Sequence, residues 1–126
     1  MDVQEFSAKL NEVQDLMQKE NYKEAISIID NLKEIEKKGD FNYNLTHRLY
    51  QLDSNSRSLY NQQVILNRIK EVSSKYKNLT FRELKEILQD KDDLVLSIDI
   101  LKREIELLIL RNELFCKIEN EKIILY

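Results

Sequence analysis

Residues 78–88, NLTFRELKEIL, and residues 114–126, LFCKIENEKIILY, decide the fold of this chain. In the first stretch, Thr80 lies three residues before Glu83, the spacing of a capping box in which each side chain bonds the other residue's backbone N–H. A short helix is therefore predicted from about residue 80 through Leu88. The second stretch is rich in β-forming residues on both sides of the polar residues 119–122, which predicts a two-stranded hairpin.

Between these two stretches, apolar residues return every three or four positions, as they do on one side of a helix. They are Ile98, Leu101, Ile105, Leu108 and Ile109. A long helix is also predicted upstream, at residues 58–76, from a similar stripe. Helix, short capped helix, second helix and hairpin follow one another in the order of a winged helix. We predict this domain over residues 58–126.

Two amphipathic stripes lie at the N-terminal end of the chain. Their apolar residues are Val3, Phe6, Leu10, Val13 and Met17, followed by Ala25, Ile28, Ile29, Leu32 and Ile35. The polar pair Glu20-Asn21 separates them, and Gly39, a residue able to adopt positive φ, follows the second stripe. Two such helices, closely joined, predict an antiparallel hairpin. Residues 21–26 resemble the turn and second helix of a single tetratricopeptide unit.

A third stripe, formed by Leu45, Leu49 and Leu52, predicts one more helix. The polar residues 53–56 then predict a break, with Ser54 or Ser56 as the cap of the following helix. One glycine and no proline favour long helices over an all-β fold. The predicted fold class is therefore mainly α. A helical hairpin and linker helices fill residues 1–57, and a winged helix with a C-terminal β-hairpin fills residues 58–126.

The C-terminal half resembles the PCI-domain family, whose members are subunits of the proteasome lid, the signalosome and a translation initiation factor complex. Residues 78–84 are similar to the start of the family's second helix. Residues 101–114, with Glu104, the pair Leu107-Leu108 and the run Asn112-Glu113-Leu114, are similar to its next helix and turn. Residues 117–124 are similar to its strand pair. The resemblance implies a winged helix that serves as a subunit of a multiprotein complex.

The charge balance bears on the alternative function of a winged helix, which is to bind nucleic acid. The chain has 20 basic and 23 acidic residues, and its net charge is −3. Residues 77–126 hold nine basic and eleven acidic residues, a local net charge of −2. A protein that binds phosphates needs a basic surplus. A nucleic-acid-binding regulator that uses Lys102, Arg103 and Lys117 therefore remains the second hypothesis.

The residues that carry catalysis or bind metals are few. His47 is the single histidine, and its neighbours supply neither a nucleophile nor an orienting carboxylate. Cys116, the single cysteine, falls on the apolar side of a predicted strand, so burial is expected. The acidic residues 90–93 lack the glycine and the terminal glutamate of a calcium-binding EF-hand loop. We expect no catalytic residue, no cofactor and no metal, and therefore no enzyme.

Three features bear on the compartment. The acidic, polar residues 1–5 are not typical of a signal peptide. No apolar run approaches the roughly 20 residues that a membrane span needs. A single cysteine excludes an internal disulfide and fits a reducing compartment. The expected location is the cytoplasm, or the nucleus of a eukaryotic cell.

The function that remains is that of a non-catalytic adaptor or scaffold subunit that docks other protein subunits. The run Ile123, Ile124, Leu125 and Tyr126 is apolar on both faces, so it is a candidate exposed sheet edge for a partner's strand. The alternative is that this strand only closes the hairpin onto the helices. Tyr50 and Tyr60 are candidate aromatic anchors or core residues. A homodimer through the stripe of residues 3–17 is a further alternative.

Overall fold

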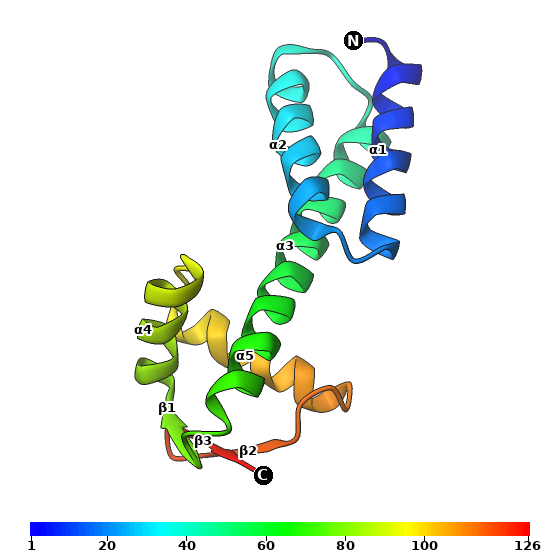
Figure 1. The fold of residues 1–126 in the computed structure, drawn as a ribbon. Coiled ribbons are helices and arrows are strands. Elements are labelled where there is room, and N and C mark those ends of the chain that lie inside the picture. The colour runs from blue at the N-terminus through cyan, green and yellow to red at the C-terminus, as the bar shows by residue number, and fades with distance from the viewer. The chain divides into compact units, whose positions relative to one another are not determined.

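The computed structural model describes residues 1–126, which divide into two compact units, Met1–Tyr60 and Asn61–Tyr126. The chain forms five helices and three short strands, and Figure 1 shows how they follow one another from the N-terminus to the C-terminus. The first unit holds α1 (Val3–Gln18), α2 (Tyr22–Lys38) and the first part of α3 (Tyr43–Val72). The sequence placed the division at residues 57 and 58. The predicted fold class, mainly α with a C-terminal β-hairpin, is confirmed.

The first unit is built around the two predicted stripes. Asp2 caps α1 by accepting the N–H of Glu5 at 2.8 Å, and residues 19–21 turn the chain back into α2. In Figure 1 the two helices lie side by side as a hairpin. Their fully buried apolar residues, together with two from α3, form one core. These residues are Phe6, Leu10, Val13, Ala25, Ile29, Leu32, Leu49 and Leu52.

Gly39 follows the last residue of α2, as predicted, but it does not adopt the expected positive φ. Its φ is −109°, so the glycine is not in the left-handed region. A Cβ at this position would instead lie 2.5 Å from the ring of Phe41, which itself stacks on Phe6 at a centroid distance of 4.4 Å. The absence of a side chain lets that aromatic pair close the end of the core.

The predicted break at residues 53–56 is wrong, because α3 runs without interruption from Tyr43 to Val72. Asn42 accepts the N–H of Leu45 at 3.0 Å and so caps its first turn. Ser56, expected as a possible cap, lies inside the helix and is fully buried, where its hydroxyl donates to the carbonyl of Asp53 at 3.1 Å. Polar residues that favour caps in isolation are held in this helix by their own hydrogen bonds.

The second unit begins within α3 and continues through β1 (Asn78–Thr80), α4 (Phe81–Asp92), α5 (Ile98–Leu110), β2 (Cys116–Glu119) and β3 (Lys122–Leu125). The predicted capping box is present: the hydroxyl of Thr80 accepts the N–H of Glu83 at 3.0 Å, and the Glu83 carboxylate accepts the N–H of Thr80 at 3.0 Å. Ser97 caps α5 by a single bond, in which its hydroxyl accepts the N–H of Ile100 at 3.2 Å. Both helices therefore begin at side-chain caps that are visible in the sequence.

The three strands form an antiparallel sheet in the order β1-β3-β2. Leu79 lies opposite Ile123, which in turn lies opposite Ile118. The predicted order of a helix, a short capped helix, a second helix and a two-stranded hairpin is present in this unit. Strand β1 was not predicted. Its presence corrects the expectation of an exposed edge at residues 123–126, because β3 is the central strand and is paired on both sides.

The core of the second unit is mainly apolar, although Gln62 and Glu104 are buried as well. It is formed by residues from all its helices and all three strands. They are Ile65, Ile69, Val72, Leu79, Phe81, Leu84, Leu88, Leu96, Leu101, Ile105, Leu108, Leu114, Cys116 and Ile123. Because α4 and α5 cover only the side of the sheet that carries Ile123 and Cys116, the other side of the sheet is left for the solvent.

Candidate functional site

The outer face of the C-terminal sheet is the candidate site. Side chains alternate across a strand, so the burial of Cys116 and Ile123 fixes which residues point away from the core. We call this surface the outer sheet face. It consists of the strand residues Asn78, Lys117, Glu119, Lys122 and Ile124, together with Phe115 and Tyr126, which lie just outside the ends of β2 and β3. No other element of the second unit covers it.

One end of the outer sheet face is aromatic. Cys116 lies opposite Leu125, so Phe115, just before β2, and Tyr126, just after β3, lie at the same end of the sheet. The two rings are 71% and 82% exposed. Ile124, partly buried, follows them in the middle of the sheet, between Lys117 and Asn78. Exposed apolar side chains that form a contiguous patch, rather than single ones, mark a surface that another molecule covers.

The other end of the outer sheet face is polar and slightly hollowed. The hollow has a volume of about 320 Å³ and is lined by Asn78, Glu119, Asn120, Lys122 and Ile124. The Lys117 ammonium lies 3.5 Å from the Glu119 carboxylate, and the two side chains are 60% and 52% exposed. The ion pair is therefore well solvated, and either side chain can turn to another partner at little cost.

Beside this face, β2 has a free edge. Asn120 and Glu121 join β2 to β3 with positive φ at both residues, 49° and 65°, as a tight two-residue turn requires. In such a hairpin the closing pair, Glu119 with Lys122, exchanges hydrogen bonds, and pairs then alternate along the ladder. The backbone groups of Ile118 therefore point away from β3, toward the free edge. A strand edge of this kind can pair with another strand.

The predicted partner-binding residues are divided by the structure. Tyr126 and Ile124 lie on the outer sheet face, whereas Ile123 is fully buried and Leu125 packs against the core. Phe115 was missed, although the alternation of Leu114, Cys116 and Ile118 predicts that it points outward.

The two predicted tyrosine anchors lie in the first unit. Tyr50 is 40% exposed, but its hydroxyl donates to Glu36 at 3.2 Å, and the Lys33 ammonium lies 5.7 Å from its ring centroid. Tyr60, the last residue of that unit, is partly buried. Neither residue lies on the outer sheet face.

Each of the three predicted nucleic-acid-binding cations lies beside a carboxylate. Lys102 is 2.6 Å from Glu121, Arg103 is 3.4 Å from Glu104, and Lys117 pairs with Glu119 as described. The exposed positions of α5 also include the acids Asp99 and Glu106. Acids at these positions repel phosphate, so the geometry disfavours docking of a nucleic acid on α5.

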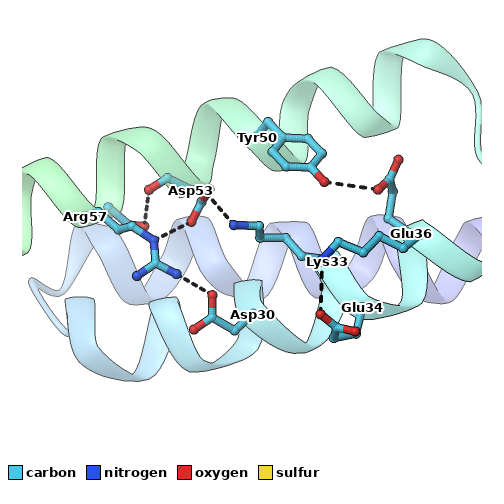
Figure 2. Close-up of polar contacts among 9 residues, drawn as sticks. Asp30, Lys33, Glu34, Glu36, Tyr50, Asp53 and Arg57 are labelled. Atoms are coloured by element: carbon cyan, nitrogen blue, oxygen red, sulfur yellow. Dashed lines mark hydrogen bonds and ion pairs between the residues drawn. The ribbon is translucent and has the colours of Figure 1, made fainter.

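In the first unit, charged side chains form a network between α2 and α3 (Figure 2). Asp53 accepts hydrogen bonds from Lys33 at 3.1 Å and from Arg57 at 2.8 Å, and Arg57 also reaches Asp30. Burial by itself would raise the pKa of Asp53, but the two cations outweigh it and hold the pKa below its usual value. The charged groups of this surface are therefore satisfied within the unit.

The remaining reactive side chains are engaged in packing. Cys116 is buried, and burial raises the pKa of its thiol, which lowers its thiolate fraction. His47 stacks on Tyr43 with a centroid distance of 5.7 Å. Asp92 accepts two hydrogen bonds from Arg68, at 2.9 and 3.0 Å. No group of three or more His, Cys, Asp or Glu side chains gathers in a way that could hold a metal ion.

Comparison with protein-family models gives no match, and neither do comparisons with curated proteins and with solved structures. None of the helices combines the length and the apolar character needed to cross a membrane.

Proposed function

We propose that this protein is a non-catalytic protein–protein interaction subunit that docks its partner on the outer sheet face and the adjoining free edge of β2. The observation that carries the proposal is the exposure of Phe115 and Tyr126, 71% and 82%, at one end of a sheet whose outer face is uncovered. Aromatic residues are enriched in the contact cores of protein interfaces. A paired polar rim around Lys117 and Glu119 completes the usual anatomy of such a surface.

The resemblance of residues 78–124 to the winged helix of PCI-domain subunits supports the same function. In that interpretation the chain is a scaffold component of a multiprotein complex. The cytoplasm or the nucleus suits it, because the single thiol is packed in the core and needs no oxidising compartment.

The test is capture of partners by the full chain at physiological salt, compared among variants. Phe115→Asp and Tyr126→Asp each place a charge in the aromatic end of the outer sheet face. Tyr43→Asp is the matched control, because this tyrosine is 77% exposed but lies in the first unit. Circular dichroism and thermal melting of each variant establish that it remains folded.

We expect a stoichiometric set of proteins to co-purify with the wild-type chain and with Tyr43→Asp, and to be lost from both sheet variants. An identical set on all four chains would show that the outer sheet face is not the contact. Recovery of nucleic acid without a protein partner, with steep loss as salt rises, would instead support the nucleic-acid-binding alternative through Lys102, Arg103 and Lys117.

A further inference from the structure

The free edge of β2 carries a charge pattern that is complementary to itself. Lys117 and Glu119 lie on the same side of the strand, one on each side of Ile118. Their charges are opposite, and their side chains are 60% and 52% exposed. When two such strands run antiparallel about a twofold axis at Ile118, the lysine of each copy lies opposite the glutamate of the other.

The direction of the backbone groups permits this register. In an antiparallel ladder, residues whose N–H and C=O point toward the neighbouring strand pair with residues of the same kind. Ile118 has its groups directed to the free edge, because its pairing with Ile123 is the non-hydrogen-bonded kind. Ile118 can therefore exchange two backbone hydrogen bonds with Ile118 of a second copy.

The charges of Lys117 and Glu119 favour the register centred on Ile118 over the register centred on Lys117. A shift by one strand position in each copy would place Cys116 opposite Ile118 and would bring the two Lys117 side chains face to face. Like charges directly opposite each other destabilise a strand pair, whereas opposite charges stabilise it. The register centred on Ile118 avoids that clash and gives two favourable cross-strand ion pairs.

We propose that the partner docked along β2 is a second copy of this chain, paired antiparallel about Ile118, so that the two three-stranded sheets become one continuous sheet. This inference rests on the proposed function of the same surface and names its occupant. The Lys117–Glu119 pair within one chain is exchanged for pairs between chains. The exchange is easy because both side chains are solvated beforehand.

The twofold arrangement also places the outer sheet faces of both copies on the same side of the joined sheet. Opposite residues of an antiparallel pair project to the same face. The aromatic ends, with Phe115 and Tyr126 of each copy, therefore flank the new strand pair and extend the apolar area available to it. A four-residue edge alone is a small interface, so we expect a weak dimer that depends on concentration.

The test is a charge swap measured by sedimentation equilibrium of the full chain over a range of concentrations. Lys117→Glu places two carboxylates opposite each other in both symmetry-related pairs, and Glu119→Lys places two ammonium groups there. We expect either single variant to weaken dimerisation at least tenfold, because both symmetry-related pairs change at once. The double variant Lys117→Glu/Glu119→Lys restores opposite charges and should return the dissociation constant to within about threefold of the wild type.

The matched control is Lys37→Glu, which breaks a comparable surface pair with Glu34, 3.4 Å apart and 61% and 65% exposed, in the first unit. It should leave dimerisation unchanged. A wild-type chain that stays monomeric at every concentration, or a double variant as weak as the singles, would overturn the proposed dimer. If no dimer is detected but capture of partner proteins still depends on Phe115, the proposed function holds and the partner docked along β2 is a different protein. If capture is also insensitive to Phe115, both proposals fail.

Discussion

The two units of this protein use their charged side chains in different ways. Between α2 and α3 of the first unit, Asp53 accepts hydrogen bonds from both Lys33 and Arg57, so these charged groups are satisfied within the unit. On the sheet of the second unit, the charges of Lys117 and Glu119 are solvated, and Phe115 lies exposed beside them. The first arrangement stabilises a fold, whereas the second leaves a surface and a strand edge available to another molecule.

The largest expected effects come from the two cores. Phe6 and Phe81 are fully buried, one in each unit, and replacing either with alanine should lower the free energy of unfolding by about 3–5 kcal/mol. Hydrogen exchange should then show loss of protection mainly in the unit that carries the substitution. Equal loss of protection in both units after either substitution would show that they unfold as one body, and the comparison between them would lose its basis.

The charged network of the first unit should contribute less to the free energy of unfolding than a buried core residue does. In Asp53→Ala, Lys33 and Arg57 both lose an acceptor, so we expect the free energy of unfolding to fall by about 1–2 kcal/mol. Urea denaturation measures the change. The control Glu34→Ala removes a more exposed pair with Lys37 and should change stability by less than about 0.5 kcal/mol. Equal effects of the two substitutions would contradict a structural role for the network.

The Asp53 carboxylate should make the stability of the first unit depend on pH in the acidic range. The pKa of Asp53 is lower in the folded chain than in the unfolded chain, because Arg57 and Lys33 stabilise its charge. Its contribution is therefore complete above the ordinary pKa of an aspartate, about 3.9, and is lost as pH falls through the lower folded pKa. We expect Asp53→Asn to flatten the pH dependence of stability below about pH 4. Parallel curves for variant and wild type would contradict this assignment.

The smallest expected effect concerns the turn that leads into β2. Asn112 adopts a φ of 59°, in the left-handed region, where a glycine is under no steric strain. Asn112→Gly should therefore raise the free energy of unfolding by a few tenths, up to about 0.5 kcal/mol. Thermal melting detects the change. In Arg111→Gly, where φ is −86°, glycine brings no such relief and should lower stability instead.

Local signals in the sequence predicted most of the fold. The apolar stripes located α1, α2 and α5, and the Thr80–Glu83 capping box located the start of α4. These signals are read within a few residues, so no tertiary information is needed. The hairpin of β2 and β3 was found for the same reason.

The sequence-based predictions were wrong where contacts between residues far apart in the sequence determine the structure. Strand β1 is three residues long and exists because Leu79 pairs with Ile123, more than forty positions away in the sequence. Without β1, the sequence offers residues 123–126 as a candidate edge, whereas in the structure β3 is central and β2 is at the edge. The break predicted at residues 53–56 is wrong partly because Asp53 bonds Lys33 on α2, a contact that a local sequence pattern does not reveal. Phe115 could have been found from strand alternation alone.

The most direct test of the docking surface is the hydrogen-exchange rate of the Ile118 backbone amide, measured by nuclear magnetic resonance in the dilute chain and in the assembled state. The account predicts fast exchange in the dilute chain, because this N–H faces the free edge of β2, and marked slowing on assembly. The neighbouring amide of Lys117, which faces β3, serves as an internal reference. If the rate at Ile118 stays the same on assembly while amides elsewhere become protected, the free edge of β2 is not the docking site.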